Sequence, residues 1–174
     1  MQEDIQKVLN RMCDPKEEEA YHFADKLGGM ADEETKEHLI TLVKGDQWEI
    51  AYLACRALSK TSWNEASLDA IFEAILDKKN KAVQGAFVQI LEEFNLSEYF
   101  VDVFRVYLFG NYKASTLAKD YLDELEFEIS PRTIRKAEKH WNHYLHNPED
   151  EESAGLKKRE VELMLKELKD LFKE

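Results

Sequence analysis

Glycine, proline and cysteine are scarce in this 174-residue sequence, which contains six glycines, three prolines and two cysteines. So little glycine and proline excludes collagen-like and low-complexity chains. Cys13 and Cys55 form no CxxC pair and are too few for a disulfide framework, so we expect a reducing compartment. No apolar run approaches the roughly 20 residues of a membrane span, and residues 1–4 lack the layout of a signal peptide. We therefore expect a cytoplasmic protein with no membrane partner.

Positive charge is also in deficit. The chain has 24 lysine and arginine residues against 36 acidic residues, a formal net charge of −12. A surface of this sign repels a polyanion, so nucleic acid is not the expected partner. With 44% hydrophobic residues at this length, the chain has enough apolar surface for one core, and we expect a single domain over residues 1–174.

The apolar residues recur with helical spacing along almost the whole chain. Ile5, Val8, Leu9 and Met12 are one example of the i, i+3, i+4, i+7 pattern. Together with expected caps such as Asp32 and Ser130 and with helix-ending residues, the pattern predicts ten helices, at about 2–13, 15–28, 32–44, 46–60, 64–77, 80–94, 97–109, 111–127, 131–146 and 154–173. Residues 98–109 would also suit a buried strand, but they would have no partner strand, which favours a helix.

Part of this helical pattern repeats. Four expected helix caps are 32, 34 and 31 residues apart, namely Asp14, Asp46, Asn80 and Asn111. When the helices that follow them are aligned, one column contains only leucine, at Leu27, Leu58, Leu91 and Leu122. We expect these leucines to be equivalent and buried, and Gly28-Gly29 to end its helix. Two helices about every 32 residues are typical of a solenoid; a bundle without repeats is the alternative.

Residues 14–127 thereby resemble the HEAT-like repeats, in particular the short type found in phycobilisome lyases. Segments 46–58 and 80–91 match that type best, and Leu27-Gly28 keeps its closing Leu-Gly pair. The resemblance implies an all-α, right-handed α-α superhelix, a HEAT-like solenoid of about five helix pairs with a concave face. The arginine that follows the first apolar position in the family is absent from all four repeats. The Asp–Arg ladder that joins successive repeats in the family is therefore expected to be missing.

The sequence contains no recognisable catalytic motif: GxGxxG, the P-loop, HExxH and GxSxG are all absent. His140, His143 and His146 lie at i, i+3 and i+6 beside an acidic run. Only two of the three can share one edge of a helix, so we interpret them as surface histidines rather than a metal site. We therefore expect no enzymatic activity, no cofactor and no metal.

Two sets of residues are candidates for partner binding. Arg132, Arg135, Lys136 and Lys139 fall on one face of the predicted helix 131–146, which has Glu138 as its only acidic residue. Such a basic stripe can bind phosphates or an acidic partner. Trp48 and Trp63 are predicted at a helix start and in a connection, where aromatic side chains either bind partners or pack on the neighbouring repeat.

The sequence as a whole predicts a protein–protein interaction module, a scaffold or adaptor that binds another protein on the concave face of a solenoid. On that face the expected side chains are mixed to acidic, so the partner is expected to be basic or neutral. One alternative is an acidic inhibitor or immunity-type protein that neutralises a basic partner. Another is a HEAT-like nucleic-acid-binding protein or DNA glycosylase that uses the basic stripe.

Overall fold

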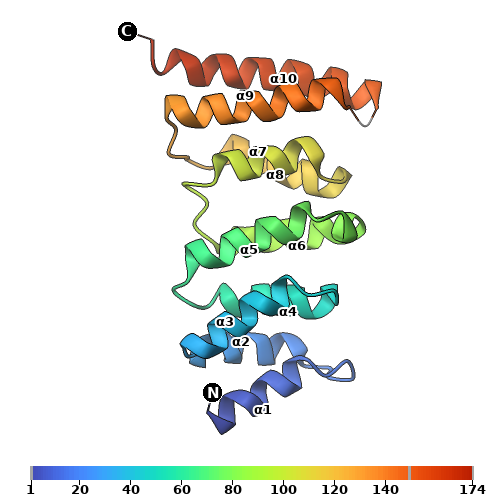
Figure 1. Ribbon diagram of the computed structural model, residues 1–174, viewed down its shortest axis with the longest axis vertical. Coiled ribbons are helices and arrows are strands. Elements are labelled where there is room, and N and C mark those ends of the chain that lie inside the picture. Colours follow the sequence, from blue (N-terminus) through green and yellow to red (C-terminus); the bar gives the residue numbers. More distant parts are fainter. Residues whose placement is uncertain (1, 149, 174) are drawn as a thin grey trace. The chain divides into compact units, whose positions relative to one another are not determined.

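The computed structural model describes residues 2–148 and 150–173. Within them the chain is helical and has no strand, which confirms the all-α prediction and the helical interpretation of residues 98–109 (Figure 1). The α-helices are α1 (Glu3–Met12), α2 (Ala20–Met30), α3 (Glu33–Val43), α4 (Trp48–Leu58), α5 (Asn64–Leu76), α6 (Gln84–Ile90), α7 (Phe100–Phe109), α8 (Tyr112–Glu124), α9 (Pro131–His146) and α10 (Glu151–Asp170). Two short 3-10 helices are η1 (Lys78–Val83) and η2 (Leu91–Glu93). None of the helices formed by the described residues is both long and apolar enough to cross a lipid bilayer.

The chain divides into two compact units, unit 1 (Met1–Asn95) and unit 2 (Leu96–Glu174). Consecutive helices pair within each unit: α1 with α2, α3 with α4 and α5 with α6 in unit 1, then α7 with α8 and α9 with α10 in unit 2. Neighbouring pairs also pack on one another. In unit 1, α4 lies between α2 and α6, and α3 contacts α5; in unit 2, α7 contacts α9. Each unit is thus built from successive helix pairs.

The leucine column of the repeat lies in the core for three of its four members. Leu27 and Leu58 are 0% exposed and Leu91 is 1% exposed. Leu122 is only half-buried, because its side of α8 lines an open groove toward α10. The predicted burial is correct for the first three leucines and wrong for Leu122.

Three predicted helix caps are confirmed. The side chains of Asp32, Asn111 and Ser130 each accept a hydrogen bond from the backbone N–H three residues later, at 2.8, 2.9 and 3.2 Å. Ser130 and Thr133 also form a reciprocal capping box, and Pro131, between them, takes the first helical position. These caps satisfy backbone donors that have no partner inside the helix, so a local signal was sufficient to place them.

Two of the predicted caps that define the repeat spacing, Asp14 and Asp46, do not cap a helix. Asp14 closes a turn by accepting the N–H of Lys16 at 2.9 Å, and α2 begins only at Ala20. Asp46 is exposed and accepts a hydrogen bond from Nζ of Lys79 at 3.0 Å, while the first residue of α4 follows an N-cap with no side-chain hydrogen bond. Both carboxylates therefore accept hydrogen bonds from other donors: Asp14 from a backbone N–H two residues later, and Asp46 from a side chain 33 residues later.

Asn80, a third predicted cap, is buried and closes the end of α5 instead. Its Nδ2 donates to the carbonyl oxygen of Ala74 at 2.9 Å, and Nε2 of Gln84 donates to that of Ile75 at 2.7 Å. Both carbonyls belong to the last turn of α5, where they have no partner inside the helix. The side chains of Asn80 and Gln84 thus bond to the end of α5, and the single helix predicted for residues 80–94 is divided into η1, α6 and η2.

Helix α2 continues through Gly28 and Gly29, where the sequence predicted its end. A Cβ atom on Gly28 would lie 2.2 Å from the carbonyl oxygen of Ala57, whereas a Cβ on Gly29 would have no neighbour within 4 Å. Gly28 therefore permits the close approach of α2 to α4, and its role is packing rather than termination.

An ion pair joins α2 to α4. Nε and Nη2 of Arg56 each donate to one carboxylate oxygen of Asp25, both at 2.8 Å. The guanidinium also lies 5.1 Å from the ring centroid of Tyr21. Asp25 and Arg56 are 31 residues apart, which is one repeat. The sequence analysis did not predict this acid–arginine link between successive helix pairs.

We expect this pair to contribute stability above about pH 5 and to lose that contribution below about pH 4. The hydrogen bonds from Arg56 hold the pKa of Asp25 below its ordinary value. A carboxylate with a lower pKa in the fold stabilises it when ionised, and the effect is lost as the pH falls through the folded-state pKa. Both side chains are about one-third exposed, so Asp25→Asn should lower the free energy of unfolding at pH 7 by only about 0.5–1 kcal/mol. Urea unfolding of both proteins at pH 7 and pH 3 is the measurement, and a difference that is as large at pH 3 as at pH 7 would contradict this assignment.

Candidate binding surfaces

An open groove of about 410 Å³ runs between α8 and α10 of unit 2, and we call it the apolar groove. Its apolar lining consists of Phe100, Leu122, Leu125, Phe127, Ile129, Leu163, Met164, Leu168 and Leu171. Of these, Leu125, Leu163 and Leu171 are 43%, 58% and 69% exposed. Single exposed leucines are common on protein surfaces, but several around one groove form the kind of patch at which proteins dock.

The apolar groove exists because the apolar stripe of α10 is wider than the surface that α9 covers. Val161 and Leu165 are buried, at 0% and 7% exposure. Met164 and Leu168, which lie three residues after Val161 and Leu165 in the same apolar stripe, are only half-buried and line the groove. A helix of a globular protein normally buries such a stripe, so this part of α10 is left available to another apolar surface.

Toward the N-terminal part of α10, the groove continues into a polar section of about 400 Å³ that also includes Glu160. Here Nζ of Lys157 lies 5.4 Å and 5.3 Å from the ring centroids of Tyr107 and Tyr144, and it donates to the carbonyl oxygen of Leu108 at 3.2 Å. The Tyr107 hydroxyl donates to the carboxylate of Glu160. Burial and this hydrogen bond raise the pKa of Tyr107, which therefore stays protonated. These contacts join α10 to α7 along one wall of the groove.

The charges around the apolar groove are mainly acidic. Nζ of Lys119, on α8, lies 2.7 Å and 2.5 Å from the two carboxylate oxygens of Asp123, so its charge is locally neutralised. Glu160 and Glu167 line the α10 side. The charged side chains that line the apolar groove therefore have a net negative charge.

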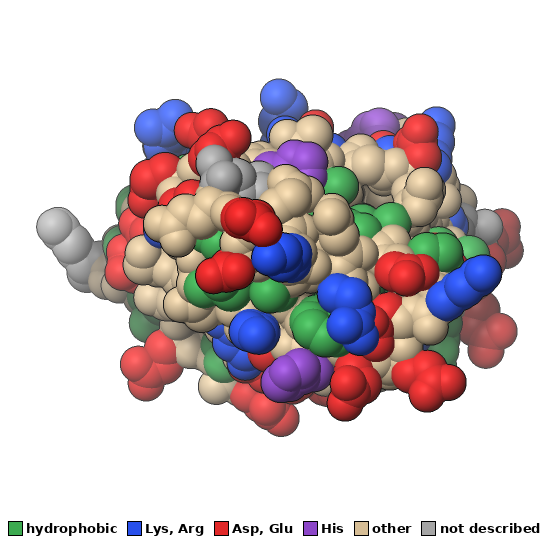
Figure 2. Space-filling view, turned by 90° about the horizontal axis from the view of Figure 1, so that it is seen from below, with side chains coloured by type: hydrophobic (Ala, Val, Ile, Leu, Met, Phe, Trp, Pro, Cys, Tyr) green, Lys and Arg blue, Asp and Glu red, His purple; other side chains and the backbone are tan. Residues whose placement is uncertain are grey.

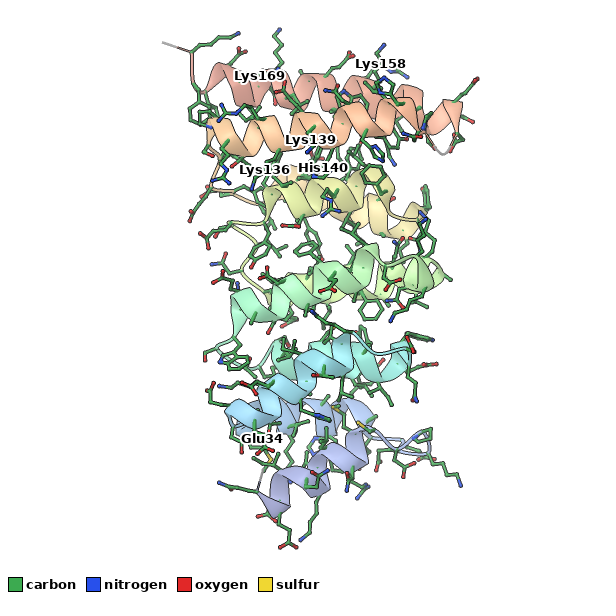
Figure 3. All side chains as sticks on the ribbon, in the orientation of Figure 1. Glu34, Lys136, Lys139, His140, Lys158 and Lys169 are labelled. Carbon is green, nitrogen blue, oxygen red and sulfur yellow. The ribbon has the colours of Figure 1, made fainter. Side chains whose placement is uncertain are left out.

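A second groove, of about 590 Å³, lies between α7 and α9 of the same unit, and we call it the basic groove. Its charged and titratable lining residues are Glu98, Asp102, Arg105, Arg132, Lys136, Lys139 and His140. Figure 3 shows Lys136 and His140 on the side of α9 that faces α7. Three of the four predicted basic residues are therefore brought together, whereas Arg135 is exposed on α9 but does not line the groove.

Arg105 is the important addition to the predicted basic set. It lies on α7, and its Nε atom is buried without a hydrogen-bond acceptor among the described residues. Across the groove, burial of His140 together with the positive charges of Arg105, Lys139 and His143 lowers the pKa of His140. The cations of α7 and α9 are thus close enough to influence one another.

The basic groove has two different ends. The backbone N–H of Glu128 donates to the carbonyl oxygen of Ser97 at 2.8 Å, which places the residues that lead into α9 beside those that lead into α7. The two helices therefore begin at the same end of the groove, where Glu98 and Asp102 lie. Arg105 lies farther along, near Lys139 and His140. One end of the groove is mixed in charge, and the other is basic.

The two predicted tryptophans are on unit 1 and have different surroundings. Trp48, the first residue of α4, is 39% exposed. Trp63 precedes α5 and is half-buried, with Nζ of Lys36 5.3 Å from its ring centroid. Trp48 is therefore available to a partner, whereas the face of Trp63 is already occupied by a cation from α3.

One face of the molecule is shown in Figure 2, where acidic and basic side chains are interspersed. Charge of one sign is not concentrated over this face. The basic groove between α7 and α9 is in contrast a local concentration of cations, on a chain whose net charge is −12.

The two cysteines are not activated. Burial raises the pKa of both thiols, and Cys55 is 0% exposed. In the part of the chain that the structure describes, no three His, Cys, Asp or Glu side chains are grouped so that they could hold a metal ion. His146 instead makes a hydrogen bond through Nδ1 with the carbonyl oxygen of Asn142, at 2.6 Å.

Both grooves contain residues that sequence reasoning missed. Arg105 and His140 did not enter the predicted basic set, because Arg105 belongs to a largely apolar helix and His140 was interpreted as a surface residue. The apolar groove was missed because Leu122, Met164 and Leu168 look like core residues in the sequence.

Comparisons of the chain with protein-family models, with curated proteins and with solved structures gave no match.

Proposed function

We propose that this protein is a helical-repeat binding module that docks an amphipathic helix of a partner protein in the apolar groove. The observation that carries the proposal is the cluster of exposed leucines around an open groove between α8 and α10. An amphipathic helix that lies in such a groove buries apolar side chains spaced at i, i+3, i+4 and i+7. Helix α10 has 20 residues and is therefore about 30 Å long, enough to accompany several turns of a partner helix.

The charges around the apolar groove indicate which residues the partner helix has beside its apolar stripe. Asp123, Glu160 and Glu167 lie around the groove, and the lysine among them is already paired with Asp123. A partner helix with lysine or arginine beside its apolar stripe would complement these carboxylates, whereas an acidic helix would be repelled. The proposal is therefore a neutral to basic amphipathic helix.

We propose the HEAT-like superhelix as the arrangement of the helix pairs. Its support is the pairing of successive helices in each unit and the one-repeat spacing of contacts such as Asp25–Arg56. The function proposed is binding alone, with a protein as the partner and no chemical step.

A pair of synthetic helices tests the groove. Both peptides have leucine at i, i+3, i+4 and i+7, and the remaining positions are rich in lysine in one peptide and in glutamate in the other. We expect the lysine peptide to bind the chain more tightly in a fluorescence anisotropy titration, and Leu163→Asn to weaken binding about tenfold, because one apolar anchor is lost.

Leu145→Asn is the matched control. Leu145 is also an exposed leucine, on α9, and it does not line the apolar groove. Neither substitution changes the net charge, so any general attraction of a basic peptide to an acidic chain is the same in both variants. Equal affinities of the Leu163→Asn and Leu145→Asn variants would show that the groove is not the binding site.

A further inference from the structure

We propose that the basic end of the groove between α7 and α9 binds a phosphate group carried by a phosphorylated segment of a partner protein. This surface is distinct from the apolar groove, and the inference does not depend on the helix-docking function. It goes beyond that function by naming a second site and the chemistry of its ligand.

The first reason is an unneutralised group of cations. Arg105, Lys136 and Lys139 line the groove together with Arg132, and none of the four forms an ion pair within the described residues. Elsewhere in unit 2, Lys119 and Lys169 are paired with carboxylates. On a chain with an excess of 12 acidic residues, these four cations give the groove lining a net positive charge even though Glu98 and Asp102 belong to it.

The second reason is the hydrogen-bonding capacity of Arg105. Its Nε–H is buried and finds no acceptor among the described residues, and a buried donor without an acceptor is costly. Because the Arg105 side chain lines the groove, a small rotation of that side chain would allow an anion in the groove to accept this hydrogen bond. Guanidinium groups bind phosphate oxygens with two parallel hydrogen bonds, so Arg105 and the lysines of α9 could engage different oxygens of one phosphate.

The charge pattern along the groove favours a single phosphate over a polyanion. Glu98 and Asp102 line the end at which α7 and α9 begin. A nucleic acid strand that followed the groove would bring its next phosphates toward these carboxylates. A peptide with one phosphorylated side chain and a basic or neutral flank would instead place its phosphate near Arg105 and Lys139 and its flank near the carboxylates.

Binding to peptide libraries tests this proposal. One degenerate, fluorescein-labelled peptide library has a fixed central phosphoserine, and matched libraries have serine or glutamate at that position. We expect the phosphoserine library to bind the full chain about tenfold more tightly than the serine library and clearly more tightly than the glutamate library, because a phosphate dianion supplies more charge and more acceptors than a carboxylate. Equal binding of phosphoserine and glutamate would overturn the assignment to phosphate.

Exposed residues of α9 provide the matched variants. We expect Lys136→Ala/Lys139→Ala to weaken phosphoserine binding about tenfold or more, and Arg135→Ala to change it less than twofold. All three side chains are exposed on the same helix, but Arg135 lies outside the groove lining. An equal loss in the Arg135→Ala variant would indicate diffuse electrostatic attraction, and tighter binding of duplex DNA than of the phosphopeptides would make the groove a nucleic-acid site. Either result would overturn the proposal.

Titration of inorganic phosphate gives a second readout, by NMR of the histidine side chains. The charged and titratable groups around His140 are Glu98, Asp102 and Arg105 on the α7 side, and Lys136, Lys139 and His143 on α9. A bound dianion would offset the cations, so we expect the pKa of His140 to rise with added phosphate. The ring signals of His22 and His38, in unit 1, serve as the reference. A His140 signal that does not respond at millimolar phosphate would contradict the site even if the libraries bound elsewhere.

Discussion

Leu58→Ala and Leu91→Ala are each expected to lower the free energy of unfolding by about 2–5 kcal/mol. Both leucines are buried, at 0% and 1% exposure, in unit 1. Truncation to alanine removes their transfer free energy and leaves a cavity that the surrounding helices fill only partly. Urea unfolding followed by circular dichroism is the measurement.

Leu53→Ala is the control for this prediction. Leu53 lies on α4 with Leu58, but it is only half-buried. Its truncation should cost about 1–2 kcal/mol, because less apolar surface is returned to water and no closed cavity forms. If Leu53→Ala were as destabilising as Leu58→Ala, the leucine column would have no special place in the packing of unit 1.

Gly28→Ala and Gly29→Ala are expected to change stability in opposite directions. The new Cβ at position 28 would lie 2.2 Å from the carbonyl oxygen of Ala57, and that backbone oxygen can move only if α2 and α4 separate. We expect a loss of about 3 kcal/mol, at the upper end of the cost of overpacking. At position 29 the Cβ meets nothing within 4 Å, so alanine should stabilise α2 by about 0.5–1 kcal/mol through its higher helix propensity.

The two glycine variants differ by one position in the same helix, so each is the control for the other. Thermal and urea unfolding of both proteins are sufficient to compare them. Stabilisation by both alanines would mean that α2 and α4 are not in close contact at Gly28. Destabilisation by both would mean that the pair ends the helix, as the sequence predicted.

Local sequence signals were sufficient for the secondary structure of most of the chain. The helical periodicity placed ten helices, and Asp32, Asn111 and Ser130 marked the starts of three of them correctly. These signals depend on residues three or four positions apart, which meet in any helix whatever the rest of the fold does. The leucines of the first three repeats were found for the same reason, since each lies on the apolar face of its own segment.

Local signals failed where a group outside the predicted helix, near or distant in the sequence, competes for the same side chain. Asp46 accepts a hydrogen bond from Lys79, and Asn80 closes the end of α5 instead of starting a helix. Gly28 has the sequence context of a helix end, but the backbone of α4 is what requires a glycine there. Neither a competing donor 33 residues away nor a neighbouring backbone can be read from the spacing of residues within one helix.

The sequence by itself determined that this chain is all-helical and which faces of its helices are apolar, because both follow from periodicity along one segment. Only the tertiary structure decided which parts of those faces are covered. It left Leu163 and Leu171 exposed beside a half-buried Leu122, and it brought Arg105 to Lys136 and Lys139 while excluding Arg135. Burial depends on how the neighbouring helices pack, so both grooves are properties of the folded chain rather than of any one helix.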